Sequence, residues 1–365
     1  MSPAGGNQDR NLDVLRAIAV LLVLFDHVGF YTGAPESVKA VLFLLGHAGV
    51  IIFFVHTSLV LMRSLERNKA RGLTGWLRAR DFYIRRAFRI YPLAIVTVVA
   101  VIAFHLPRGP ADPTFTSPTP KEIVANLLLV QNLVVARPVI APLWSLPVEI
   151  EMYVVLPILF VLVRRADRRR LILFMVTAVT LAALYLLVGD LLAGLWRLSI
   201  FDYVPCFVAG VVAFRACQLL RPRLPASVWP VIVLTIVIGN ALIPRYNDSA
   251  GHLRDWLVAL IVASFIPLVT ELRPSLFTRA AHQVAKYSYG IYLSHVPALD
   301  VAGIFMRNEP LWLRIVTGTL GIVVLPFLLY HLIEEPMIEA GTRTAAHLSR
   351  RHVPAPTLAS TAPAP

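Results

Sequence analysis

Apolar residues dominate long stretches of the chain between Leu12 and Ile333, and only short polar segments interrupt them. Most stretches have about 20 residues, the length that an α-helix needs to cross the hydrocarbon core of a bilayer. The pattern predicts an all-α polytopic membrane protein, a bundle of about ten transmembrane helices. The expected spans cover residues 12–30, 41–62, 88–105, 143–163, 171–188, 200–219, 228–243, 254–270, 286–306 and 311–333.

The composition agrees with this pattern, because 57% of the residues are hydrophobic and 15% are charged. Soluble domains carry about 25% charged residues, so a soluble enzyme is excluded. Cys206 and Cys217 would lie about 16 Å apart on one helix, which is too far for a disulfide. Two cysteines are also too few for a metal cage, and no zinc motif is present. We therefore expect no metal.

Positive charge is distributed unevenly along the chain, which has 34 Lys and Arg, 21 Asp and Glu, and a net charge of +13. With the N-terminus inside, about 25 basic residues fall on the cytoplasmic side and about 9 on the other. The inner loops then include residues 63–87 and the stretch RRADRRR at 164–170. This bias predicts cytoplasmic N- and C-termini in the plasma (inner) membrane, and it explains the charge without nucleic acid as a partner.

The chain divides into three parts by composition. Residues 1–10 are expected to be a cytoplasmic segment, 11–340 an integral-membrane domain, and 341–365 a cytoplasmic, disordered tail rich in Pro, Ala and Thr. The longest outer connection, 106–142, begins with a Pro-rich stretch that cannot be helical. The apolar piece at 123–135 is too short to cross and is expected to be re-entrant or interfacial.

Ionisable residues at membrane depth are costly and mark functional sites. In the first span, Arg16 and His27 are eleven residues apart, so they share a helix face and lie about 16 Å apart along its axis. Their presence argues for a retained span rather than a cleaved signal. The pair suits a ligand with an anionic head at the inner surface and a reactive end in the bilayer. The alternative is a snorkelling Arg and a structural His.

Seven segments in the same order resemble the membrane acyltransferase 3 family, in which an Arg and a His separated by ten residues belong to the first span. They are NLDVLRAIAVLLVLFDH, GVIIFFVHTSLVL, YIRRAFRIYPL, LWSLPVEIEMYVVLP, FDYVPCFVAG, YSYGIYLSHVPAL and LIEEP. The resemblance covers residues 11–336, and we expect the acyltransferase domain alone, without an added soluble hydrolase-like domain. The chain departs from the family at His56-Thr57-Ser58, where an apolar-Ser-Gly triplet is usual.

The resemblance implies O-acylation, the transfer of an acyl group, commonly acetyl, from acyl-CoA to a hydroxyl of a carbohydrate-containing acceptor such as an envelope polysaccharide or glycolipid. Arg86 and Arg89 enter the third span from the inner side and share a helix face. Their planar guanidinium groups suit the phosphates of coenzyme A. With Arg16 they are the expected cofactor-binding residues, and the alternative is a topological anchor.

Acyl transfer from a thioester requires a base for the alcohol proton, and His27 is the candidate because it lies in the outer half of its span. Glu149 lies at a comparable depth, with Tyr153 one turn further on the same face. Glu149 would orient His27 or hold the acceptor hydroxyl, and Tyr153 would contact substrate. The alternative for Glu149 is a helix cap beside Pro147.

His295 falls near mid-membrane in the ninth span and would line the same cavity or bond a neighbouring helix. Glu334 matches the acidic position of the family's closing motif and is assigned to substrate binding. Asp26 is expected to point away from the helix face of His27. The sequence contains no Gly-x-Ser-x-Gly motif, which favours direct attack by the acceptor. A different class remains open, a secondary transporter that uses buried His and Glu residues as a proton relay.

Overall fold

The computed structural model describes residues 9–109, 112–188, 200–242 and 248–350. Within these ranges the chain forms helices and no β-strand, so the expected all-α class is confirmed. The helices are α1 (Arg10–Tyr31), α2 (Glu36–Ala70), α3 (Gly75–Ala103), α4 (Pro120–Leu128), α5 (Ser145–Val163), α6 (Arg168–Val188), α7 (Ile200–Leu219), α8 (Trp229–Leu242), α9 (Asp248–Phe265), α10 (Leu276–Asp300), α11 (Leu311–Leu329) and α12 (Glu335–Arg350).

Seven helices of the described residues are long and apolar enough to cross a membrane. They are α1, α2, α3, α5 with the preceding 3₁₀ turn Ala141–Trp144, α6, α7, and the continuous helix that joins α11 to α12. Of the remaining expected spans, α8 has 14 residues and α9 has 18, while α10 carries charged residues in its first half. The expectation of ten spans therefore stays a prediction.

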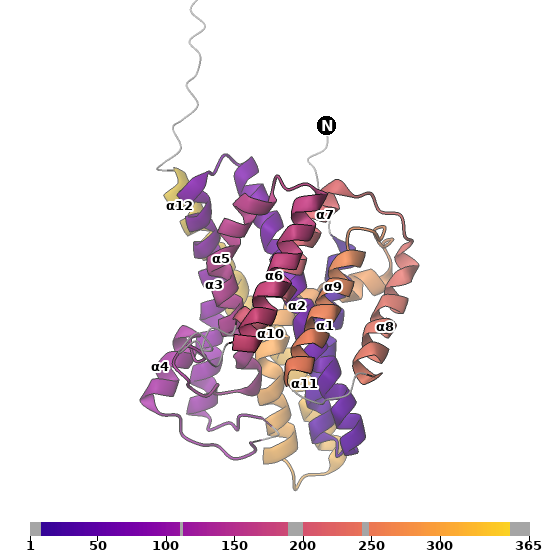
Figure 1. Ribbon diagram of the computed structural model, residues 1–365. Coiled ribbons are helices and arrows are strands. Elements are labelled where there is room, and N and C mark those ends of the chain that lie inside the picture. The colour runs from indigo at the N-terminus through magenta and orange to yellow at the C-terminus, as the bar shows by residue number, and fades with distance from the viewer. Residues whose placement is uncertain (1–8, 110–111, 189–199, 243–247, 351–365) are drawn as a thin grey trace, which may run out of the picture.

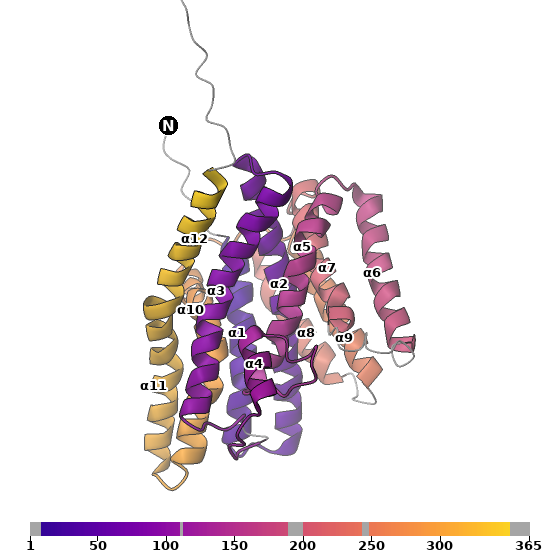
Figure 2. The same ribbon diagram turned by 90° about the vertical axis from the view of Figure 1, so that its left-hand side faces the viewer.

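The helices stand side by side in one bundle, with α1 and α2 at its centre and α6 at its edge (Figures 1 and 2). α2 packs against α1 and α7, and α1 also packs against α10. Small residues allow these close approaches: a side chain at Gly49 would overlap the Ala19 carbonyl, and one at Gly210 would overlap the Val55 carbonyl. Small residues are typical of helix contacts in membranes, where van der Waals packing replaces the hydrophobic effect.

The two ends of the described chain lie at one end of the bundle. Asp9 caps α1 and pairs with Arg63 near the end of α2, and Arg80 near the start of α3 donates to the Leu348 carbonyl of α12. This agrees with the expectation that both termini lie on one side of the membrane. That this side is the cytoplasm stays a prediction. α12 stays helical through residues 341–350, which the sequence assigned to a disordered tail. Residues 351–365 and most of the segment 1–10 lie outside the described ranges.

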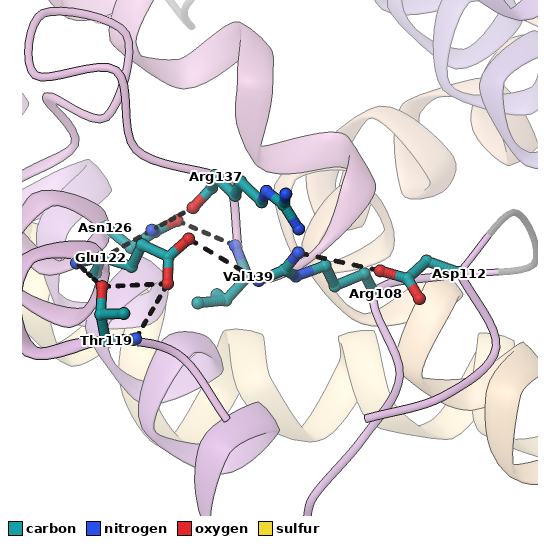
Figure 3. A network of polar contacts seen from close by, with 7 residues as sticks. All are labelled: Arg108, Asp112, Thr119, Glu122, Asn126, Arg137 and Val139. Carbon is teal, nitrogen blue, oxygen red and sulfur yellow. Dashed lines mark hydrogen bonds and ion pairs between the residues drawn. The ribbon is translucent and has the colours of Figure 1, made fainter. Parts of the chain in front are cut away.

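The outer connection is folded rather than loose. α4 begins with a capping box, in which Thr119 and Glu122 bond each other's backbone N–H. Asn126 of α4 donates to the Arg137 carbonyl at 2.8 Å and accepts from the Val139 N–H at 3.0 Å, which ties the return segment to α4 (Figure 3). The apolar piece expected at 123–135 is therefore a short helix followed by turns, bound to the outer ends of α3 and α5.

Candidate active site

A polar pocket of about 90 Å³ lies inside the bundle between α1, α2, α3, α5 and α10. Five of the eight predicted site residues line it: Arg16, Arg86, Arg89, Glu149 and Tyr153. These residues come from three helices that are far apart in the sequence. The structure therefore brings these five residues together around one cavity.

Arg16 is fixed in the pocket by α10. Its Nε donates to Ser288 Oγ at 2.6 Å, and that hydroxyl donates to the Ala285 carbonyl at 2.8 Å. The guanidinium group is therefore held toward the cavity rather than extended to the membrane surface, as a snorkelling arginine would be.

The arginines of α3 differ in their partners. Arg89 forms an ion pair with Glu334, whose side chain is fully buried and whose Oε2 has no partner among the described residues. Arg85 instead bonds Asp81 at 2.8 Å and Thr342 at 3.0 Å and does not line the pocket. Arg86 lines the pocket, and no carboxylate of the described chain forms an ion pair with it. Glu334 therefore holds Arg89, whereas Arg86, like Arg16, lines the pocket without an ion-pair partner among the described residues.

Glu149 and Tyr153 form one unit on the α5 side of the pocket. The Tyr153 hydroxyl donates to Glu149 Oε1 at 2.7 Å, so the one-turn spacing does place both side chains on one face. The start of α5 has no side-chain cap hydrogen bond, which argues against the capping role for Glu149. Nor does a hydrogen bond join Glu149 to His27 in the described structure, so the proposed orientation of His27 by Glu149 is not seen.

His27 and His295 lie against each other, one from α1 and one from α10. Their ring centroids are 4.8 Å apart and the rings meet edge to face at 81°. Each Nδ1 lies 2.9 Å from a carbonyl one turn earlier, that of Val23 or Ile291. Because a carbonyl can only accept, Nδ1 must carry the proton and Nε2 keeps its lone pair. His295 Nε2 is buried and has no partner among the described residues.

Tyr292 is in contact with both the pocket and the histidine pair. It lines the pocket, its ring lies 6.2 Å from that of His295, and its hydroxyl lies 2.7 Å from Ser145 Oγ and donates to the Pro142 carbonyl at 2.8 Å. Neither His27 nor His295 lines the pocket itself. The predicted site residues therefore form two adjoining groups, an arginine pocket and a histidine pair, rather than one continuous cavity.

Two buried acids near the histidine pair were not assigned to the site from the sequence. Asp26 faces Gly46 of α2 while His27 faces His295 of α10, as the helix position of Asp26 predicted, and its Oδ2 lies 3.9 Å from His27 Nδ1. Asp300 accepts a hydrogen bond from Tyr31, and its Oδ2 has no partner among the described residues. The sequence spacing could have indicated the Tyr31–Asp300 contact, because Tyr31 follows His27 by about one helix turn and Asp300 follows His295 by about one helix turn.

The unusual triplet of the second span contributes to the pocket. His56 and Thr57 line the cavity opposite the α3 arginines. Ser58 is fully buried and donates to the Phe54 carbonyl at 2.8 Å, facing Gly210 of α7. The departure from the family pattern thus changes two side chains that line the pocket and one that packs between helices.

The chain is similar in sequence to several known proteins. Over 91% of its length the chain is 26% identical to the putative peptidoglycan O-acetyltransferase YrhL of Bacillus subtilis, of which it covers 55%. It is 34% identical to the acyltransferase MdmB of Streptomyces mycarofaciens over 44% of this chain and 41% of that protein. It is 24% identical to nodulation protein 10 of Rhizobium leguminosarum bv. viciae over 92% of this chain and 95% of that protein.

The chain thus spans about half the length of the Bacillus protein and nearly all of the Rhizobium protein. No solved structure matches it. A family model described as an acyltransferase domain matches residues 9–331, which include all the predicted site residues except Glu334. The chain therefore belongs to the acyltransferase 3 family.

Proposed function

We propose that this protein is a membrane O-acyltransferase that moves an acyl group, in the first place acetyl, from acyl-CoA to a hydroxyl of a carbohydrate-containing acceptor. The observation that carries the proposal is the convergence of Arg16, Arg86 and Arg89 on one pocket that adjoins two base-competent histidines. Membership of an acyltransferase family favours this function over a proton-coupled transporter.

The arginine pocket is the donor site in this proposal. Arg86 supplies an uncompensated positive charge, Arg89 is aimed by Glu334, and Arg16 is aimed by Ser288. Guanidinium groups bind phosphate oxygens through paired, charge-assisted hydrogen bonds. The cavity of about 90 Å³ suits the thioester end of the donor, and the bulky nucleotide would remain toward the inner surface.

The histidine pair is the catalytic group. The acceptor oxygen forms a bond to the thioester carbonyl carbon while its proton passes to Nε2 of His27, and the carbon–sulfur bond then breaks. The proton returns from His27 to the departing coenzyme A thiolate, so that protons and charges balance. Because Nδ1 of His27 already donates to the Val23 carbonyl, the ring is held in the tautomer that this role requires.

The acceptor reaches the histidine pair from the outer side. His27 lies one turn from the end of α1, and His295 lies one turn from the end of α10. The Bacillus relative is named as an enzyme of peptidoglycan, which supports a carbohydrate acceptor here and a place in the plasma (inner) membrane. Tyr292 joins the two groups, since it lines the pocket and its ring lies 6.2 Å from that of His295.

The proposal is tested with purified protein in vesicles that contain acyl-labelled acetyl-CoA. The enzyme should release coenzyme A slowly by hydrolysis and faster when a carbohydrate acceptor is added, with label appearing on the acceptor. A protein that binds no acyl-CoA and releases no coenzyme A under these conditions would contradict the donor assignment. Mass spectrometry of envelope glycans from cells with and without the protein would then identify the acceptor.

A further inference from the structure

A second, larger cavity of about 620 Å³ lies on the outside of the bundle between α3, α10 and α11. α10 packs against both other helices and forms its floor. The walls include Val96 and Ala100 of α3, and Leu320 and Val324 of α11. Figure 2 shows these helices at one edge of the bundle, away from α6 and α8. We call this cavity the α3–α11 groove.

The groove is suited to a hydrocarbon chain. Three hydroxyl-bearing residues, Thr97, Ser294 and Thr317, stand among an otherwise apolar lining. Thr97 and Ser294 donate to the Leu93 and Gly290 carbonyls at 2.9 and 2.8 Å, so neither offers a free donor to a ligand. The α11 residues of the groove span residues 317–329, which rise about 18 Å. That length is more than half of a hydrocarbon core about 30 Å thick.

Basic side chains stand at the outer end of the groove. Leu106 lines both the groove and a small adjoining cavity that is also lined by Arg108. Arg108 lies 3.7 Å from Asp112 and 3.9 Å from Glu122, and Arg137 extends over the same network toward Arg108 (Figure 3). No carboxylate of the described chain pairs with Arg137.

The same outer segment lies close to the histidine pair. Leu293, Ser294 and Pro297 of α10 line the groove, while His295 between them turns inward to His27. The backbone at Gly109, next to Arg108, packs against Val296, since a Cβ at Gly109 would lie 3.6 Å from Val296 Cγ1. A ligand held by the groove and by Arg108 would therefore have its head within one helix turn of the proposed base.

We propose that the α3–α11 groove binds the hydrocarbon chain of a lipid-linked carbohydrate acceptor, whose phosphate is bound by Arg108 and Arg137. This inference rests on the proposed O-acyltransfer and names the acceptor as an anionic glycolipid rather than a free polysaccharide. The phosphate fixes the depth of the lipid, and the first sugar beyond it lies beside His27 and His295. An ordinary phospholipid also carries a phosphate, but as a diester between two acyl chains and a small headgroup, so phosphatidylglycerol is the competitor that tests selectivity for the single chain of a carrier.

The test is photolabelling of the full chain in phosphatidylcholine vesicles with a diazirine-bearing polyprenyl phosphate. The same chain with a neutral hydroxyl head, and a diazirine phosphatidylglycerol, serve as comparison probes. We expect the polyprenyl phosphate to label α3 and α11 at the groove and to be displaced by unlabelled polyprenyl phosphate. An excess of phosphatidylglycerol should not displace it.

Matched variants separate the chain site from the phosphate site. Ala100→Trp places an indole in the groove, whereas Val99→Trp places it on the neighbouring lipid-facing position of α3, which does not line the groove. Ala100→Trp should reduce labelling about tenfold or more, and Val99→Trp should leave it unchanged. The double variant Arg108→Gln with Arg137→Gln should weaken labelling by the phosphate probe about 10- to 100-fold and spare the neutral probe. Arg307→Gln, at an exposed residue of the α10–α11 loop, is the control.

Two results would overturn the inference. Equal labelling by the phosphate and neutral probes would mean that the groove holds bulk lipid only, and unchanged labelling in Ala100→Trp would mean that the chain binds elsewhere. Release of coenzyme A from acetyl-CoA is measured on the same samples. If wild-type protein releases it and the groove variants bind the probe normally, the inference fails while the proposed function stands. If wild-type protein binds the probe but never consumes acetyl-CoA, the proposed function fails instead.

Discussion

The arginine pocket and the histidine pair differ in how their polar atoms are satisfied. In the pocket, Arg16 is held by Ser288, Arg89 by Glu334, and Glu149 by Tyr153. In the histidine pair, each ring is anchored through Nδ1 alone, and His295 Nε2 meets no partner in the described structure.

This difference matches the two roles proposed above, donor binding in the arginine pocket and proton transfer at the histidine pair. A site that holds a ligand benefits from side chains whose geometry is fixed in advance, because less freedom is lost on binding. A general base needs a free lone pair at the reacting position, and a buried polar atom without a partner is costly unless it has such a role. In the proposed function, the arginine pocket therefore binds the donor and the histidine pair carries out the proton transfer.

The roles proposed for the two regions depend first on which end of the bundle faces the cytoplasm. Only two orientations are possible, so the expected labelling result is all-or-none. Single cysteines at Arg71 and Ser117, in a background of Cys206→Ala and Cys217→Ala, should respond oppositely to an impermeant maleimide in intact cells. Both positions are exposed. The charge bias predicts labelling at residue 117 and none at residue 71 until the cells are opened. The reverse pattern would exchange the donor and acceptor sides.

The next largest effect is expected at His27. His27→Gln keeps a side chain able to donate to the Val23 carbonyl but removes the base, so transfer should fall about 10²- to 10⁴-fold. Binding of acetyl-CoA, measured by titration calorimetry, should remain near the wild-type value because His27 does not line the pocket. His295→Gln is the companion variant, since its ring offers the alternative Nε2.

Substantial transfer by His27→Gln together with its loss in His295→Gln would move the base to α10. A fall in yield and melting temperature in both variants, at unchanged transfer per folded molecule, would instead make the pair structural. These outcomes are distinguishable because each Nδ1 bonds a carbonyl of its own helix, and losing one such hydrogen bond costs about 0.5–1.5 kcal/mol of stability rather than the catalytic rate.

Helix periodicity was enough to predict much of the site. The eleven-residue spacing of Arg16 and His27 put both on one face, and both do meet α10, through Ser288 and His295. The four-residue spacing of Glu149 and Tyr153 likewise predicted their contact. These relations lie within single helices, where the 3.6-residue repeat fixes which side chains are neighbours.

Relations between helices could not be derived in the same way. Nothing in the spacing of His295 or Tyr292 indicates that the tyrosine lines the arginine pocket while His295 contacts His27. Lipid-facing and buried surfaces are both apolar, so the pattern that identifies a soluble core is weak here. The extension of α2 to Ala70 and the course of α12 to Arg350 were missed for a related reason, because hydropathy marks membrane spans and not the helix ends beyond them.

A smaller effect is expected from the α3 arginines, and it sharpens the binding role of the pocket. Arg86→Ala and Arg89→Ala should each weaken acyl-CoA binding about 10- to 100-fold, the consequence of losing one charge-assisted contact of about 1.5–3 kcal/mol. Lysine at either position should recover part of the affinity. Arg85→Ala is the matched control, because Arg85 bonds Asp81 and Thr342 outside the pocket. Normal binding in all three variants would reduce these arginines to topological anchors.

The smallest predicted effect is at Tyr153, and it tests whether the polar pairs of the pocket act as units. Tyr153→Phe removes the 2.7 Å hydrogen bond to Glu149. A hydrogen bond to a charged group contributes about 1.5–3 kcal/mol, but only the part that differs in the transition state affects the rate, so transfer should fall about 2- to 10-fold. In a Glu149→Gln background the same change should have less effect, because the charged acceptor is already gone. A double-mutant cycle measures this coupling directly. Additive losses would show that Tyr153 contacts the substrate independently of Glu149, and the pocket would then resemble the histidine pair, in which each side chain presents its own free atom.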